Sequence, residues 1–189
     1  ILREAKIPVV PHYAIFAPPI KFTKETLPLV IKPNYGYSGK DVYLCENIEI
    51  AAKTSQKLLE KEKSICYSPY FESDLEYRAF FLDGKILLVY SKTKPKGSWE
   101  HNLSGGATPK IIQEDNPVYD KIKKLALQAG QALNARFVTI DILDTKTNGP
   151  MILEMNQAIS TAILLEKIPS ERERIKDIYR QAMKAMFLL

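Results

Sequence analysis

Apolar residues cluster or alternate with polar ones along six short stretches of the chain, patterns typical of β-strands. The stretches come in pairs, and each pair encloses a polar segment that contains glycine. The middle pair is joined by Asp83-Gly84, the residues preferred in a two-residue turn between antiparallel strands. The pattern therefore predicts three antiparallel strand pairs. The six strands cover residues 27–32, 42–46, 76–82, 85–92, 137–143 and 150–156.

Other segments show the spacing of amphipathic helices. One follows the first strand pair and has Asn47 placed to cap its start, a second covers Asn116–Leu133, and a basic helix begins near Ser170. A single further strand is predicted over Ser64–Phe71. Residues 93–108 are polar and contain several glycines, so they form a long loop, which in a compact domain is usually functional. Strand pairs interspersed with helices predict an α+β fold.

Composition and charge narrow the class of protein. The net charge of +5 fits anionic ligands such as nucleotides as well as nucleic acid, although charge alone favours a solvated basic surface. Cys45 and Cys66 lie in apolar runs, which favours core residues in a reducing compartment over a disulfide or zinc site. No apolar run is long enough to cross a bilayer, and the first residues lack the charged-then-apolar pattern of a signal peptide, so we expect a cytoplasmic protein without membrane association. The first residue is Ile, and we expect the chain to begin inside a larger protein.

Polar side chains gather on one face of the last strand pair. If its apolar residues share a face, Asp141, Glu154 and Asn156 lie together on the other one. Two carboxylates and an amide oxygen suit Mg²⁺ shared with phosphates. A solvent-facing strand surface is the alternative. The expected register sets Val138, Ile140 and Ile142 opposite Met155, Leu153 and Met151.

A glycine loop, a lysine and a connector are candidate nucleotide contacts. The loop Gly36-Tyr37-Ser38-Gly39 lies between two strands, so its backbone N–H groups can surround phosphate oxygens. Lys32 precedes it as a mobile positive charge, and the alternative is a surface lysine. The connector Ser68-Pro69-Tyr70-Phe71 has backbone groups for an adenine edge, and Glu76 could accept from ribose hydroxyls. From the residues alone, an ordinary connection between a strand and a hairpin is the stronger interpretation of this segment.

In their order along the chain, these motifs resemble the ATP-grasp superfamily, in particular its branch of ribosomal-protein glutamate ligases, glutathione synthetases and D-alanine ligases. The strand ending in Lys32-Pro33, with its glycine loop, is similar to that family's lysine strand and flexible loop. Glu76-Tyr77-Arg78 resembles its acidic-x-Arg strand, and the loop through Asn102 to Gly105-Gly106 resembles the segment that follows. Asp141 and the run Leu153-Glu154-Met155-Asn156 match its metal-binding hairpin. The resemblance covers residues 1 to 160.

The resemblance implies a role for each matching residue. Lys32 would bind the α- and β-phosphates, the loop Gly36–Gly39 would cover them, and Pro69-Tyr70-Phe71 would contact the adenine. Glu76 would hold the ribose. The metal ligands would be Asp141, Glu154 and Asn156, for one or two Mg²⁺ ions with Mn²⁺ as a substitute. The groups that stabilise phosphoryl transfer would be Arg78, Lys92, with Lys94 as its alternative, and Asn102.

The resemblance also implies the architecture and reaction. We expect an ATP-grasp fold of two α+β lobes with antiparallel sheets that hold ATP between them, at residues 1–66 and 67–189. The reaction is an ATP- and Mg²⁺-dependent ligation of a small-molecule or peptide carboxylate to an amine through an acyl-phosphate, compatible with a homo-oligomer. The alternative is an ATP-binding module without independent ligase activity, because Gln157–Ser160 depart from the family pattern. Nucleic-acid binding would rest on net charge alone and is not expected.

Overall fold

The computed structural model describes residues 1–17, 22–36 and 39–187. The chain divides into two compact units. The smaller is Val10–Phe71, and the larger combines Ile1–Val9 with Glu72–Leu189. Compared with the predicted lobes, the boundary lies five residues later, at 71 rather than 66, and the first nine residues belong to the larger unit. Each unit is described by itself below.

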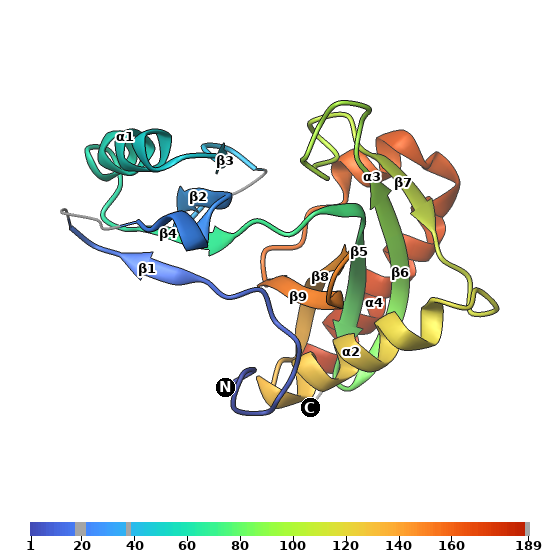
Figure 1. Cartoon of the computed structure of the whole chain (residues 1–189). Helices are drawn as coiled ribbons and strands as arrows, with labels where there is room; N and C mark the ends of the chain where they lie inside the picture. Colours follow the sequence, from blue (N-terminus) through green and yellow to red (C-terminus); the bar gives the residue numbers. More distant parts are fainter. Residues whose placement is uncertain (18–21, 37–38, 188–189) are drawn as a thin grey trace. The chain divides into compact units, whose positions relative to one another are not determined.

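The smaller unit contains a four-stranded antiparallel sheet with the order β1-β4-β2-β3 (Figure 1). The helix α1, Ile48–Leu59, follows β3, and the Asn47 side chain accepts a hydrogen bond from the Ile50 amide at 2.9 Å. The predicted cap is therefore confirmed. The strands are β1 Tyr13–Ile15, β2 Leu29–Pro33, β3 Tyr43–Cys45 and β4 Ile65–Pro69.

Burial alternates along β2 and defines the two faces of this sheet. Leu29 and Ile31 are fully buried and pack in one cluster with Ala51 and Leu58 of α1. Because successive side chains of a strand point to opposite faces, Lys32 lies on the face that α1 does not cover. The fold thus keeps this lysine outside the apolar core of the unit.

The larger unit contains a five-stranded antiparallel sheet with the order β7-β6-β5-β8-β9. One helix packs against one of its faces, and two helices pack against the other. The strands are β5 Ser73–Leu82, β6 Lys85–Thr93, β7 Thr108–Ile111, β8 Phe137–Thr145 and β9 Gly149–Asn156. The helices are α2 Tyr119–Ala132, α3 Ala162–Lys167 and α4 Arg172–Phe187.

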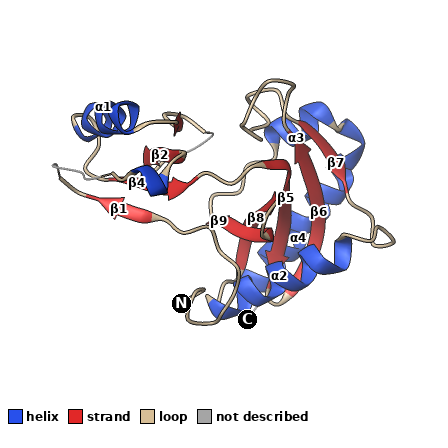
Figure 2. Ribbon diagram, viewed as in Figure 1, coloured by secondary structure: helices blue, strands red, loops and turns tan. Residues whose placement is uncertain are grey.

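Helices cover both faces of the larger sheet (Figure 2). On one face α2 packs on the odd residues of β5, such as Tyr77 and Phe81. On the other, α3 and α4 pack on Phe80 and Tyr90. The even residues of β5 that precede Phe80 are polar, so this second face is apolar at one end and charged at the other.

The turn between β5 and β6 has the backbone that its sequence predicts. Asp83 and Gly84 have φ angles of 41° and 82°. Two consecutive positive φ angles are the requirement of a primed two-residue turn, which matches the right-handed twist of the strands. The predicted hairpin is confirmed.

Two short strands and a short α-helix were not predicted from the sequence. The strands β1 and β7 have three and four residues, and the helix α3 has six. Segments this short contain at most two periods of a helix or a strand pattern, so their periodicity cannot be distinguished from that of a loop. Pairing with β4 and β6 defines the two strands instead.

The predicted register of the last hairpin is wrong. Ile140 lies opposite Met155, and Ile142 lies opposite Ile152, with an irregularity after Asp141 that leaves Leu153 as the extra residue of a bulge. The prediction set Leu153 opposite Ile140, two residues from the observed partner, and Met151 opposite Ile142, one residue from the observed partner. A shift of two residues keeps every side chain on its face, so alternation alone could not exclude it. Asp141 and Glu154 lie directly opposite each other.

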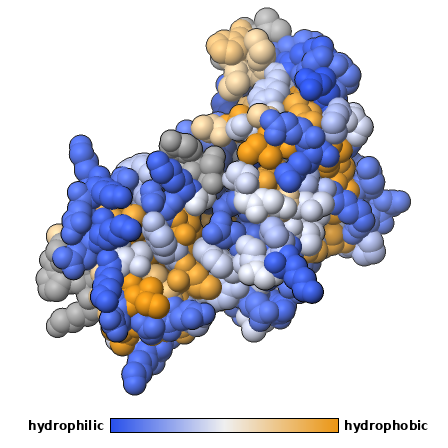
Figure 3. All heavy atoms as spheres, turned by 90° about the horizontal axis from the view of Figure 1, so that it is seen from above, coloured by the Kyte–Doolittle hydropathy of each residue, from blue (hydrophilic) through white to orange (hydrophobic). Residues whose placement is uncertain are grey.

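One face of the molecule is drawn by residue hydropathy in Figure 3. Hydrophilic side chains predominate on the face seen in Figure 3, with smaller apolar patches between them. Both cysteines are buried, as expected for core residues. In the described part of the chain, each helix is too short or too polar to span a bilayer.

Substitution of Gly130 by alanine should destabilise the larger unit by about 1–3 kcal/mol, offset by up to about 1 kcal/mol of helix propensity. A Cβ atom at this position would lie under 3.0 Å from ring atoms of Phe81, which is 1% exposed and has no room to move. Urea unfolding measures the change. Gln131→Ala, at the exposed next position, should change stability by less than about 0.5 kcal/mol, and equal effects of both variants would contradict the packing argument.

Candidate active site

Four residues from four strands form a row across the charged end of the larger sheet. Tyr90 of β6 lies opposite Arg78 of β5, Arg78 opposite Asp141 of β8, and Asp141 opposite Glu154 of β9. Directly opposed residues share a face and lie within side-chain reach. The fold therefore brings together residues up to 76 positions apart, counted as 154 minus 78. We refer to these four residues as the cross-strand row.

Asp141 accepts hydrogen bonds from three side chains. Arg78 donates through Nε to Oδ1 at 2.7 Å and through Nη2 to Oδ2 at 2.6 Å. Lys92 Nζ lies 3.3 Å from Oδ1, and Asn156 Nδ2 lies 3.2 Å from Oδ2. The two-pronged contact with a guanidinium fixes the orientation of the carboxylate. Asp141 is only 1% exposed, so this charge is held by its partners and not by water.

A second row, beside the first, contains Lys92 of β6 opposite Glu76 of β5. These two side chains form an ion pair and are 3% and 7% exposed. Lys94, the alternative to Lys92 in the sequence, instead donates to the Ser73 carbonyl and lies 3.6 Å from Asp74. Of these two lysines, Lys92 is thus the one that contacts Glu76 and Asp141.

Burial and the neighbouring cations have opposite effects on the two buried acids. Burial raises the pKa of Glu76 to about 7, and the charge of Lys92 opposes that rise. Burial also acts to raise the pKa of Asp141, but Lys92 and Arg78 outweigh it and hold this pKa below its ordinary value. At neutral pH Asp141 is therefore ionised, whereas Glu76 is close to its titration midpoint.

The three predicted metal ligands lie together. Asn156 Nδ2 is 3.2 Å from Oδ2 of Asp141 and 3.2 Å from Oε1 of Glu154, so these two carboxylate oxygens are at most 6.4 Å apart, twice 3.2. Within the described ranges, no group of three His, Cys, Asp or Glu side chains converges on one point. Two carboxylates and one amide oxygen are an incomplete set, and they fit an ion that takes its remaining ligands from phosphate or water.

Asn102 lies in the loop between β6 and β7 and contacts that loop itself. Its Nδ2 donates to Glu100 Oε2 at 3.0 Å, and its carbonyl accepts from the amides of Gly105 and Ala107. These bonds fold the loop around Asn102. They do not connect its side chain to the cross-strand row, so its predicted role in phosphoryl transfer stays a prediction.

His101 is buried in the same loop. The residue is 6% exposed, and its Nε2 has no hydrogen-bond partner in the part of the chain that the structure describes. Burial lowers the pKa of His101 to about 4, and the charges of Lys94 and Lys92 act in the same direction, opposed by Asp74. The imidazole is therefore neutral at pH 7.

This shift predicts a pH dependence of stability. Between pH 6.5 and about 4 the unfolded histidine binds a proton that the folded one excludes, so the free energy of unfolding should fall as the pH falls. The slope should reach at most about 1.4 kcal/mol per pH unit. In urea titrations His101→Gln should lack this part of the slope, and the difference from the unchanged protein removes the contribution of other acids. Parallel profiles would contradict the buried neutral state.

The predicted phosphate contacts of the smaller unit are partly described. Lys32 belongs to β2, and Gly36 is exposed in the loop that follows. Gly39 has a φ angle of 71°, a conformation that favours glycine. Tyr37 and Ser38 lie outside the described residues.

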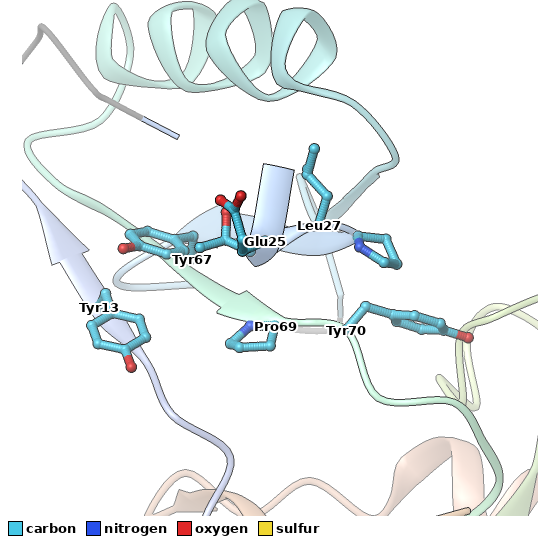
Figure 4. Close-up of a pocket in the computed structure, with 8 residues that line it drawn as sticks. Tyr13, Glu25, Leu27, Tyr67, Pro69 and Tyr70 are labelled. Carbon is cyan, nitrogen blue, oxygen red and sulfur yellow. The ribbon is translucent and has the colours of Figure 1, made fainter. Parts of the chain in front are cut away.

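The predicted adenine connector lines a pocket of the smaller unit (Figure 4). Pro69 and Tyr70 contribute to it with Tyr13, Glu25 and Tyr67, while Phe71 does not. The strand pairing sets Tyr67 and Pro69 opposite residues of β2 on the α1 side, so the pocket does not lie on the face of Lys32. The Tyr70 amide donates to the Pro28 carbonyl at 2.9 Å and is not available to an adenine ring.

Most of the sequence matches the model of a known protein family. The model of the RimK-like ATP-grasp domain matches residues 14–173, which include the glycine loop and every residue of the cross-strand row. The chain belongs to this ATP-grasp family.

Relatives of this ATP-grasp chain are longer than the chain itself. An uncharacterized protein of Mycoplasma pneumoniae is 27% identical over 146 residues, which cover 77% of this chain and 49% of that protein. A probable alpha-L-glutamate ligase of Shewanella pealeana is 26% identical over 133 residues, which cover 69% and 28%. The chain therefore spans half or less of the length of these relatives.

Solved structures share the ATP-grasp fold. The D-alanine–D-alanine ligase from Bacillus anthracis has a TM-score of 0.75 at 17% sequence identity, and the match covers 97% of this chain and 64% of that one. At this identity the likeness concerns the fold alone. It confirms the α+β class predicted from the strand pairs and helices.

Two further residues with hydroxyl groups lie on the charged face of the larger sheet and were not singled out from the sequence. Tyr90 and Thr139 are each 1% exposed and lie on the same sheet face as Arg78 and Asp141. Tyr90 precedes Lys92 by two residues, and Thr139 precedes Asp141 by two, so strand alternation alone would have placed both on this face.

Proposed function

We propose that this chain contains the catalytic core of an ATP- and Mg²⁺-dependent ligase that joins a carboxylate to an amine. The observation that supports it most is the cross-strand row, in which a buried carboxylate, a second carboxylate and a guanidinium share one sheet face. Membership of the ATP-grasp family supports the use of ATP. The resemblance to an alpha-L-glutamate ligase supports amide formation.

We infer that Asp141, Glu154 and Asn156 would hold the metal. Their donor atoms would all be oxygens once the Asn156 amide presents its carbonyl, and this set fits one or two Mg²⁺ ions, with Mn²⁺ as a substitute. When bound, Mg²⁺ neutralises phosphate charge during transfer. The residues themselves orient the ion, because Asp141 is fixed by Arg78.

The cations beside these acids suit the reacting oxygens. Arg78 and Lys92 remain protonated next to Asp141, so they can bind the oxygens of the transferred phosphoryl group. Asn102 would add a neutral donor from its loop. We propose Glu76 for the ribose hydroxyls.

In the smaller unit, nucleotide contacts are proposed for two segments. Lys32 would bind phosphate with a single positive charge, and the backbone N–H groups of Gly36, Tyr37, Ser38 and Gly39 would surround its oxygens. In the connector Pro69-Tyr70-Phe71, backbone groups other than the Tyr70 amide would contact the adenine, because that amide donates to the Pro28 carbonyl.

The proposed reaction has two balanced steps. A carboxylate oxygen attacks the γ-phosphorus of ATP, and the bond from phosphorus to the β-phosphate oxygen breaks, so ADP leaves and an acyl-phosphate forms. An amine nitrogen then bonds to the acyl carbon, and phosphate leaves with the electron pair of the broken C–O bond. The amine releases a proton to water.

Release of phosphate from ATP tests this function. The purified chain, ATP and Mg²⁺ should release phosphate only when both a carboxylate and an amine are present, and L-glutamate is the first amine to try, because a relative is a glutamate ligase. Mass spectrometry should detect the amide product. Phosphate release that ignores the acceptor in a complete screen of amino-acid pairs would overturn the proposal.

An ATP-binding module without independent ligase activity is the second candidate. It is favoured by coverage, because the glutamate ligase relative has more than three times the matched length, as 28% coverage implies. ATP binding in calorimetry without acceptor-dependent ADP release would support the module over the ligase.

A further inference from the structure

The hydroxyl of Tyr90 makes no hydrogen bond among residues 1–17, 22–36 and 39–187. The residue is 1% exposed, and its ring packs beside Phe80 with centroids 6.5 Å apart, in the apolar cluster beneath α3 and α4. A phenylalanine ring would fill the same place in this cluster, so packing alone does not account for the hydroxyl.

The neighbour of Tyr90 in the cross-strand row is also incompletely bonded. Arginine has five N–H donors, and Arg78 uses two of them, on Asp141. Five minus two leaves three N–H groups without an acceptor in the described part of the protein. The Arg78 side chain is 22% exposed, so this edge of the guanidinium is reachable by a ligand. A planar edge of this kind binds carboxylates well.

The protonation of Tyr90 makes its hydroxyl a donor. Burial raises the pKa of Tyr90 above its ordinary value, although Arg78 and Lys92 oppose the rise. The effect of these two cations also indicates that the phenol lies close to the charged end of the sheet. At pH 7 the row thus contains a neutral O–H donor beside a cationic N–H edge.

We propose that Tyr90 contacts substrate, with its hydroxyl donating to the acyl oxygen of the activated carboxylate while the outer edge of Arg78 binds the same oxygen. This inference rests on the proposed ligase function. As the amine forms the C–N bond, the electron pair of the C=O bond moves to that oxygen, and it returns when the C–O bond to phosphate breaks. Two preorganised donors would stabilise the negative charge that develops between these events.

Tyr90→Phe tests the proposal, with Tyr77→Phe as its matched control. Tyr77 lies on β5 next to Arg78, is 3% exposed, and packs on the opposite face of the sheet with α2. In Tyr90→Phe we expect kcat to fall about ten- to a hundredfold, with KM for ATP within about threefold, because one oxyanion donor is lost. Thermal unfolding should be unchanged or slightly raised, because the hydroxyl had no partner. Tyr77→Phe should keep its kcat.

A measurement without turnover separates this inference from the proposed function. Acetate is titrated into protein with ¹³C-labelled tyrosine rings in the presence of ADP and Mg²⁺, with chloride as the salt control. Each variant assigns one signal by its absence. The hydroxyl-bearing carbon of Tyr90 should shift with acetate, and that of Tyr77 should not.

The possible outcomes decide between the two ideas. An active unchanged protein with full kcat in Tyr90→Phe overturns the role of Tyr90 and keeps the ligase. An inactive unchanged protein overturns the ligase, while a shift of the Tyr90 signal with acetate would still support a carboxylate contact. A Tyr90 signal that does not respond to acetate, or a melting temperature that falls in parallel with kcat, overturns the inference.

Discussion

Replacement of Glu154 by glutamine is expected to reduce Mg²⁺-dependent turnover at least about a hundredfold and to leave the fold intact. Glu154 lies opposite Asp141 and accepts from Asn156 Nδ2 at 3.2 Å, a bond that the carbonyl of glutamine can also accept. The substitution removes one negative charge from the proposed metal ligands and preserves side-chain size. Steady-state ADP release at varied Mg²⁺ measures the loss.

The metal assignment of Glu154 needs two further measurements. Binding of Mn²⁺ in the presence of ADP, observed by electron paramagnetic resonance, should weaken in Glu154→Gln. Glu166→Gln makes the same charge change at an exposed position of α3 and should keep both activity and Mn²⁺ binding. Near-normal activity of Glu154→Gln would exclude Glu154 as a required ligand.

Replacement of Asp141 by asparagine should lower the free energy of unfolding by about 3–5 kcal/mol and abolish turnover. Asp141 is 1% exposed and accepts from both Arg78 and Lys92, so the variant would leave two cations without their main counter-charge. The amide nitrogen of the introduced asparagine is a donor, and it would face the N–H groups of Arg78 or Lys92, which are donors as well. Breaking a buried pair from one side is costly because the remaining charge cannot regain its water.

Urea unfolding followed by the fluorescence of the single tryptophan, Trp99, measures this cost. Asp144→Asn is the control on the same strand, at a half-buried carboxylate that makes no ion pair within the described ranges. It should change the free energy of unfolding by less than about 1 kcal/mol. Similar values for the two variants would show that the ion pairs of Asp141 contribute little to stability.

Local chemistry explains which features were predictable from sequence. The turn at Asp83-Gly84 follows from two residues that accept positive φ, and the cap at Asn47 follows from one side chain and a nearby amide. The common face of Asp141 and Glu154 was predictable too, because alternation determines faces even when the register is wrong.

Interactions between distant segments were not predictable in the same way. Arg78 and Asp141 are 63 residues apart, and no pattern within either strand indicates that they pair. The bulge at Leu153 escaped detection because one additional apolar residue resembles ordinary alternation. Tyr90 was overlooked for a different reason: its ring suits a core, and only the charged neighbours across the sheet give its hydroxyl a chemical meaning.

The distribution of charge between the two hairpins also affects how the larger sheet can fold during synthesis. The hairpin of β5 and β6 leaves the ribosome before that of β8 and β9, and it contains two cations of the site, Arg78 and Lys92, against one buried acid, Glu76. Asp141 and Glu154 follow about 50 and about 60 residues later, at a pace of roughly 5–20 residues per second. During those seconds, burial of the first hairpin would also bury excess positive charge, which is unfavourable. The acids of the second hairpin supply the negative charge that allows the first hairpin to become buried.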